Sequence, residues 1–164
     1  STGSAANSRA EGPCRRTRRA RAAPGSTDRV ATGTPALASD LRAAMEADNA
    51  RWLAAFNTPN PADFVAMYTS DAQLLPPGEQ PINGGPDAIR QFWESRIKMG
   101  VKEHTFEIVS VHEDGKYAYQ VAKWTVVLVK DNGERTPLAG NTVRVFERQA
   151  DGGWLTKVHI YNRY

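Results

Sequence analysis

The stretch "KYAYQVAKWTVVLVKDNGERT", residues Lys116–Thr136, carries the clearest fold signal in this sequence of 164 residues. Its first part has the length and the residue types of a long β-strand. The Asp-Asn-Gly that follows at 131–133 is typical of a tight turn between two antiparallel strands. The stretch therefore predicts a strand that turns back on itself in a hairpin.

The sequence on either side extends this pattern. "KEHTFEIVSVHEDG", residues 102–115, alternates through Phe106 and Ile108 and ends in a turn signal. "TPLAGNTVRVFERQADGGW", residues 136–154, predicts another strand and a Gly-rich turn, and "WLTKVHIYNRY", residues 154–164, predicts the last strand. We expect four long antiparallel strands in a meander.

The segments before this sheet are predicted to be helical. Apolar side chains recur with a period near 3.6 in residues 39–58 and again in residues 85–100. A short helix is expected in "PADFVAMYTSD", residues 61–71, with Tyr68 at its end, and "AQLLPPG", residues 72–78, is a short extended segment. Helices grouped before an antiparallel sheet indicate an α+β fold with the helices on one face. A sheet curved around three helices leaves a cone-shaped cavity, which is the natural place for a site.

Charge divides the chain into two parts. Residues 1–35 hold seven arginines against Glu11 and Asp28, so the remaining residues are slightly acidic although the whole chain carries +3. The first part lacks aromatic residues, and we expect a disordered basic tail at 1–35 followed by one domain at 36–164. The tail could be an arm that attracts nucleic acid, but an extension without a function is favoured, and a secretory signal is not indicated.

Several classes of protein are not indicated by the composition. No apolar run approaches the ~18 residues of a membrane span, so we expect a soluble, cytoplasmic protein. Cys14 is the single cysteine, which excludes an internal disulfide and offers no metal cluster. We expect neither a metal nor a cofactor.

Three stretches carry a resemblance to a known group of proteins: "RWLAAFNTPNPADFVAMYTSDAQLLPPG", "GGPDAIRQFW" and "GNTVRVFERQADGGWLTKVHIYN". With them, the span from Ala36 to Tyr164 resembles the SnoaL-like, ketosteroid-isomerase-like families of the nuclear-transport-factor-like superfamily. The resemblance implies a cone formed by a curved sheet and helices, and it includes polyketide-cyclase-like proteins of bacterial natural-product pathways. This fold also serves isomerases, epoxide hydrolases and non-catalytic assembly domains, so it does not fix a function.

The catalytic pattern of ketosteroid isomerase is only partly retained. The resemblance places Trp52 where that enzyme has an oxyanion-binding tyrosine, and an indole N–H is a weaker donor than a phenol. The position of the aspartate base falls at Pro76, which cannot carry a proton, and that of the late aspartic acid falls at Asn141. Steroid isomerisation by that mechanism is not expected.

Strand alternation assigns the candidates next to Asn141. We expect Asn141 and Val143 on the cavity side of their strand, and Thr142 and Arg144 on the other side. Asn141 could then donate a hydrogen bond to a ligand carbonyl, together with Trp52. The alternative is an ordinary amide satisfied by the backbone at the strand edge.

His159 is the best available proton carrier near neutral pH. The alternative is a structural histidine hydrogen-bonded within its strand. Asn162 is three residues further on, so alternation allows only one of the two to face the cavity. Lys123 could form a Schiff base with a carbonyl, although a position on the outer face explains it more simply.

Large side chains supply the expected wall of the ligand site. They are aromatic residues of the helices and strands, together with two residues at the mouth of the cone: Phe56, Tyr68, Trp93, Trp124, Leu75 and Pro76. Their number suits a flat ligand, although each aromatic residue could simply belong to the core.

The leading functional hypothesis is that the chain binds a hydrophobic small molecule, such as a polyketide-like intermediate, and assists its cyclisation or isomerisation. The alternative is a non-catalytic binding or assembly module, which the missing base at Pro76 favours. A homodimer through the outer face of the sheet is expected in either case, and nucleic acid is not an expected partner. A cavity of several hundred Å³ would favour the first hypothesis.

Overall fold

The structure is a computed structural model that describes residues 35–57 and 62–164, with side chains from Ser39 onward. Apart from Pro35, the predicted tail lies outside the described residues. The described elements follow in this order: α1 (Pro35–Asn57), α2 (Ala62–Val65), β1 (Tyr68–Leu75), α3 (Gly85–Lys98), β2 (Val101–Asp114), β3 (Tyr117–Val129), β4 (Arg135–Arg148) and β5 (Trp154–Tyr161). Within these residues, no helix has an apolar stretch long enough to cross a membrane.

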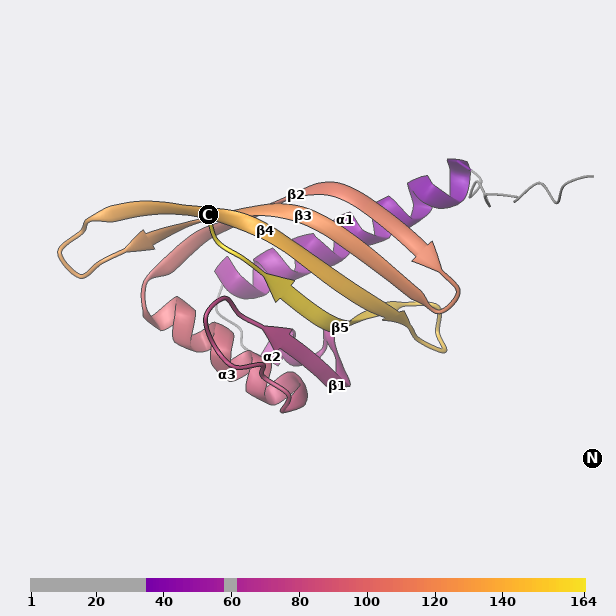
Figure 1. Cartoon of the computed structure of the whole chain (residues 1–164), viewed down its shortest axis with the longest axis horizontal. Helices are drawn as coiled ribbons and strands as arrows, with labels where there is room; N and C mark the ends of the chain where they lie inside the picture. Colours follow the sequence, from indigo (N-terminus) through magenta and orange to yellow (C-terminus); the bar gives the residue numbers. More distant parts are fainter. Residues whose placement is uncertain (1–34, 58–61) are drawn as a thin grey trace, which may run out of the picture. The chain divides into compact units, whose positions relative to one another are not determined.

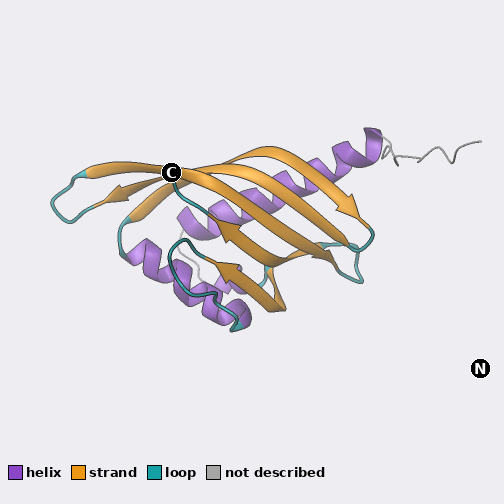
Figure 2. Ribbon diagram, viewed as in Figure 1, coloured by secondary structure: helices purple, strands orange, loops and turns teal. Residues whose placement is uncertain are grey.

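The strands form one five-stranded sheet in the order β1-β5-β4-β3-β2 (Figures 1 and 2). Strands β2 to β5 form the predicted antiparallel meander, and β1 joins its edge parallel to β5. The long helix α1 runs along one face of the curved sheet, and α3 lies beside β1 (Figure 1). The predicted α+β fold with its curved sheet and preceding helices is confirmed.

Two of the helices follow directly from the sequence pattern. In α3, Pro86 lies in the first turn and Asp87 near the positive end of the helix dipole, while Ile89, Phe92 and Trp93 are buried on one stripe. In α1 the buried stripe consists of Leu41, Met45, Asp48, Asn49, Trp52, Ala55 and Phe56. Each helix therefore presents one face to the protein interior.

The prediction for Tyr68 was wrong, because this residue begins β1 instead of ending a helix. The helix α2 stops at Val65, and the backbone N–H of Thr156 donates to the carbonyl of Met67 at 2.9 Å. Tyr68 is then paired with Thr156 in the parallel ladder. A partner strand almost ninety residues away therefore determines the local conformation, which no local pattern could indicate.

The predicted assignment of faces in β4 was also wrong. Thr142 and Arg144 are buried beneath the helices, whereas Asn141 is exposed on the outer face with Val143 beside it, half-buried. The alternation itself holds, as it must in a strand. Both faces of β4 carry apolar residues, so the apolar row of Val143 and Val145 did not identify the inner face.

A buried polar network lies between two apolar clusters of the interior. One cluster surrounds Trp52 and the other surrounds Met45, and Asp48 and Asn49 lie between these residues along α1. From the sheet, Arg144 donates to the Asp48 carboxylate at 2.6 Å and to the Asn49 side-chain oxygen at 3.1 Å. Because the side chains of Arg144 and Asp48 are 0% and 4% exposed, this ion pair joins α1 to β4 inside the protein.

Candidate functional site

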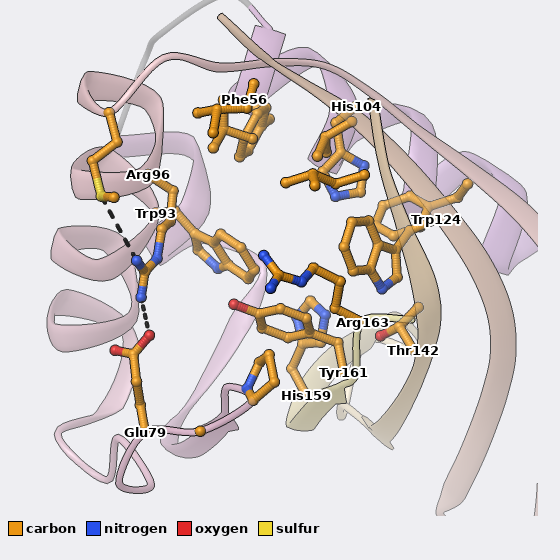
Figure 3. A pocket seen from close by; sticks show the side chains of 18 residues that line it. Phe56, Glu79, Trp93, Arg96, His104, Trp124, Thr142, His159, Tyr161 and Arg163 are labelled. Carbon is orange, nitrogen blue, oxygen red and sulfur yellow. Dashed lines mark hydrogen bonds and ion pairs between the residues drawn. The ribbon is translucent and has the colours of Figure 1, made fainter. Parts of the chain in front are cut away.

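A cavity of about 520 Å³ opens between the helices and the inner face of the sheet (Figure 3). Its wall comes from α1, α3, the loop after β1 and strands β2 to β5, together with Met99 after α3 and Arg163 after β5. Aromatic and imidazole rings supply much of the lining: Phe56, Trp93, His104, Phe106, Trp124, His159 and Tyr161. The volume lies in the range of sites for small organic molecules, which are mostly apolar with a few placed polar groups.

Tyr68 lies directly behind this wall and connects three rings by hydrogen bonds. Its hydroxyl oxygen accepts from the indole N–H of Trp52 at 3.2 Å and from that of Trp93 at 3.3 Å. The same oxygen lies 3.0 Å from Nδ1 of His159. An indole can only donate, so the two lone pairs of the hydroxyl are both occupied and its proton is left for His159.

This network fixes the protonation of His159. Because Tyr68 donates to Nδ1, that nitrogen must be the unprotonated acceptor, and Nε2 carries the ring proton. Within the described part of the chain, no hydrogen bond engages Nε2, and His159 lines the cavity. A neutral N–H donor is therefore available to a ligand at the cavity wall.

Electrostatics favour the same neutral state. Burial lowers the pKa of His159 well below its usual value, and the positive charge of Arg144 lowers it further. Burial also raises the pKa of the Tyr68 phenol, which consequently keeps its proton. His159 is a neutral hydrogen-bond donor, not the cationic acid that a free histidine can become near neutral pH.

A second histidine enters the cavity through an irregularity in β2. The pairing of β2 with β3 shifts register between Lys102 and Thr105, and Glu103 has a φ of 56°. The extra residue lets Val101 and His104, three positions apart, both line the cavity. Bulges of this kind commonly redirect side chains near functional sites.

His104 is surrounded by aromatic rings. Its ring centroid lies 4.7 Å from that of Trp52, 5.1 Å from Phe56 and 4.6 Å from Phe106. Burial lowers the pKa of His104 to about 3, with the backbone of Thr105 opposing the shift slightly. Its enclosed Nδ1 has no hydrogen-bond partner among the described residues, so the imidazole adds an unsatisfied polar group to an apolar wall.

The mouth of the cavity is lined by charged groups. Arg96 forms an ion pair with Glu79 and also contacts the sulfur of Met99 (Figure 3). Burial raises the pKa of the nearby Tyr161 phenol to about 12. Among the described residues, Glu79 is the one carboxylate that lines the cavity, and no group of three or more metal-ligating side chains is present.

Four residues predicted from the sequence do line the cavity: Phe56, Trp93, Trp124 and His159. Trp52 and Tyr68 lie behind them, and the Trp52 N–H donates to Tyr68, so it is not the donor to a ligand that we expected. Leu75 and Pro76 do not line the cavity. Backbone hydrogen bonds between Leu74 and Ile82 close the loop so that residues 77–79 lie there instead.

The placement expected for three further residues was wrong. Asn141, Val143 and Asn162 do not line the cavity. Asn162 is exposed, and its side-chain oxygen accepts the backbone N–H of Asn141 at 2.9 Å. His159 is thus the member of the pair His159 and Asn162 that faces inward. Lys123 is on the exposed face, 3.6 Å from Glu107.

Several lining residues escaped the sequence prediction, notably His104, Thr142, Tyr161 and Arg163. Alternation from His159 would have indicated Tyr161 and Arg163, since residues two and four positions along a strand share its face. His104 could not be assigned in this way, because a bulge resets the alternation.

Comparison with known proteins identifies the group to which this architecture is related. The SnoaL-like domain model matches residues 49–156. A conserved protein from Planctomyces limnophilus DSM 3776 is 19% identical, with a TM-score of 0.68 over 77% of this chain and 99% of that one. A ketosteroid isomerase-like protein from Erwinia carotovora atroseptica SCRI1043 is 24% identical, with a TM-score of 0.65 over 74% and 94%.

A protein from Catenulispora acidiphila, solved in complex with S-DNPA, is 23% identical, with a TM-score of 0.64 over 76% of this chain and 94% of that one. These identities are all below 25%, so the structural likenesses establish the fold alone. No curated protein matches the chain.

Proposed function

The chain belongs to the family of SnoaL-like domains, and we propose that its cavity binds a hydrophobic small molecule through a carbonyl group. The observation that carries the proposal is the contact of the Tyr68 hydroxyl with Nδ1 of His159 at 3.0 Å, from which we infer a neutral Nε2–H at the wall of a cavity of about 520 Å³. Aromatic rings line much of the remaining surface. The preferred ligand is flat or ring-bearing, with one oxygen that accepts from His159.

The same arrangement supports assistance to a reaction. A neutral imidazole can donate to a carbonyl oxygen as negative charge develops on it, which favours enolisation and ring closure. The proton released on enolisation needs an acceptor, and His104 is the candidate: it is a neutral imidazole that lines the same cavity, and with a pKa of about 3 it is a weak base. We therefore propose cyclisation or isomerisation of a carbonyl compound such as a polyketide-like intermediate as the chemistry of this site.

A non-catalytic binding module is the alternative function. The resemblance to ketosteroid isomerase places Pro76 at the position of that enzyme's base. Glu79, the carboxylate at the mouth, is paired with Arg96. Without an ionised base inside the cavity, the protein would bind the same ligand class and release it unchanged. Native mass spectrometry of the protein purified from its host identifies a co-purified ligand. That ligand is then incubated with the protein: a change in its mass or structure indicates catalysis, and its recovery unchanged indicates a binding module.

Carbonyl recognition can be tested with two neutral probes of similar size, acetonaphthone and ethylnaphthalene. We expect quenching of tryptophan fluorescence by both, because the wall is aromatic. The His159→Phe variant should bind acetonaphthone about five-fold to ten-fold more weakly than wild type, which is the usual effect of one lost hydrogen bond. Its affinity for ethylnaphthalene should be unchanged. Substitution of the exposed His112 by Phe is the matched control. Equal effects on both probes would disprove carbonyl recognition by His159.

The outer face of the sheet supports the proposal of a homodimer. Cross-strand pairing places Tyr119, Val145 and Val158 in one row, and Val121, Val143 and Ile160 in the next. Tyr119 and Ile160 are 42% and 43% exposed, which is a large exposure for apolar side chains on a sheet face. A second copy of the chain could cover these rows without blocking the cavity, which lies on the opposite face.

Analytical ultracentrifugation tests the dimer. We expect wild-type protein to sediment as a dimer and Val143→Glu to sediment as a monomer, because a charge would be buried in the interface. Val109→Glu, on an exposed position outside both rows, should remain dimeric. A monomeric wild type at micromolar concentration would rule out this interface.

A further inference from the structure

We propose that the ligand is a hydrophobic acid, whose carboxylate is bound at the mouth of the cavity by Arg163. This inference rests on the proposed function and names the class of its ligand. It assigns the ring-bearing body of the ligand to the aromatic wall and one carbonyl to His159. The anionic end is assigned to a guanidinium that has no ion pair or hydrogen bond among the described residues.

Arg163 is directed inward by the continuation of β5. His159, Tyr161 and Arg163 alternate along this segment, and all three line the cavity. The backbone holds its extended path beyond the strand, since Asn162 N–H donates to Asn141 at 3.0 Å and Tyr164 N–H donates to Ala139 at 3.2 Å. Arg163 is therefore anchored on both sides, so its position is defined by the sheet.

Side-chain contacts hold the same segment. The Trp124 indole N–H donates to the carbonyl of Asn162 at 3.1 Å, and the Asn162 side chain accepts from the backbone of Asn141. Gly140 permits this close approach, because a Cβ there would come within 1.9 Å of the Asn162 carbonyl oxygen. Asn162, the residue before Arg163, is thus held against β4 and against Trp124 of the cavity wall.

The charges at the mouth do not cancel. Glu79 is paired with Arg96, whereas Arg163 makes no ion pair or hydrogen bond within the described residues. Figure 3 shows the Arg163 guanidinium extending across the cavity towards Trp93, without the interactions drawn for Arg96. The three charged side chains at the mouth therefore leave one positive charge that an anionic ligand can neutralise.

The chemistry of this charge favours a carboxylate. A guanidinium binds a carboxylate through two parallel N–H···O hydrogen bonds, and such charge-assisted pairs are stronger than neutral ones. Arg163 is an exposed residue, and the rings of Trp93 and Tyr161 beside it (Figure 3) provide an apolar surface next to the charge for the body of the ligand. The donor of His159 at the inner wall and the cation at the mouth would together orient an elongated keto acid.

The test compares naphthoylpropionic acid, an aryl ketone with a terminal carboxylate, with its primary amide. Dissociation constants are measured by quenching of tryptophan fluorescence. We expect wild-type protein to bind the acid about ten-fold more tightly than the amide, which corresponds to about 1.4 kcal/mol. In Arg163→Gln the acid should lose this advantage while the affinity for the amide is unchanged. Added salt should weaken binding of the acid alone.

Arg148→Gln is the control, since it removes the same charge from an exposed arginine that does not line the cavity. It should retain the preference for the acid. Equal binding of acid and amide by wild type, failure of both to bind, or retention of the preference in Arg163→Gln would each overturn the inference. Acetonaphthone separates the two proposals: if it binds through His159 while the acid shows no preference, the proposed function stands and the assignment of Arg163 fails.

Discussion

The hydroxyl of Tyr68 lies 3.0 Å from Nδ1 of His159. Both lone pairs of that hydroxyl accept indole protons, from Trp52 and Trp93. One phenol consequently determines which nitrogen of the histidine carries a proton, and the nitrogen available to the cavity is a donor. The site is thus prepared for a hydrogen-bond acceptor by Tyr68, which does not itself line the cavity.

Substitution Tyr68→Phe should test this arrangement. It removes the acceptor of two buried indole N–H groups and the donor to His159, so the free energy of unfolding should fall by about 2–3 kcal/mol. Nitrogen NMR of labelled histidine should change from one His159 tautomer, protonated at Nε2, to a mixture. Tyr119→Phe, on the outer face, is the control for both measurements. A single unchanged tautomer in Tyr68→Phe would show that another group fixes the proton.

Stability should depend on pH because both cavity histidines have lowered pKa values, that of His104 lying at about 3. The unfolded chain binds these protons near pH 6.5 and the folded chain does not, so stability is complete above pH 6.5 and is lost as pH falls towards the folded pKa. Each histidine should contribute up to about 1.4 kcal/mol per pH unit in this window.

Urea unfolding of wild type and His104→Phe between pH 7.5 and about 4.5 measures this contribution. The variant should show a shallower fall in the free energy of unfolding than wild type, whereas His112→Phe should show the wild-type slope. An identical slope in His104→Phe and wild type would mean that His104 is protonated in the folded state.

The buried pair of Arg144 and Asp48 should be costly to break and less costly to replace. Asp48→Leu leaves a buried guanidinium without its carboxylate and should destabilise the protein by about 3–5 kcal/mol. The double variant Asp48→Leu/Arg144→Met should recover part of this loss, since neither charge remains. Urea unfolding of the single and double variants measures the coupling.

Glu134→Gln, which removes a surface ion pair with Lys130, is the reference and should change stability by less than about 1 kcal/mol. If the double variant loses as much free energy of unfolding as the two single variants together, Asp48 and Arg144 contribute independently and the prediction fails.

The positive φ of 56° at Glu103 predicts opposite effects of two substitutions. Glu103→Gly should relieve about 1 kcal/mol of backbone strain, whereas Glu103→Val should add to it, because a β-branched side chain is disfavoured in the left-handed region. Both variants lose the exposed ion pair with Arg135, so Arg135→Gln provides the correction for that contact. Urea unfolding should rank glycine above valine by more than about 1 kcal/mol; equal stabilities would show that this bulge is unstrained.

Much of the fold was accessible from the sequence because its signals are local. The turn at 131–133 and the alternation around it predicted the meander, and the apolar stripes of α1 and α3 predicted two helices. The resemblance to SnoaL-like proteins predicted the family and the curved sheet. The site was less accessible, and its best-placed candidate was His159, a lone titratable group on an apolar strand.

Both errors arose where a contact between segments far apart in the sequence decided the structure. In β4, the period-two alternation predicted which residues share a face. Because both faces carry apolar side chains, it did not indicate which of them is covered by the helices. Asn141 and Val143 were consequently assigned to the wrong side. In β1, pairing with β5 over a separation of almost ninety residues replaced the helix expected at Tyr68.

The sequence by itself determined the order of elements, the turns and the residues that share a strand face, because periodicity and turn chemistry act over a few residues. Only the tertiary structure decided the contact of Tyr68 with His159, which are 91 residues apart, and the entry of His104 through a bulge. It also placed Arg163 at the mouth with no ion-pair partner among the described residues. These features depend on which strands pair and in which register, and pairing is decided by the burial of the whole sheet.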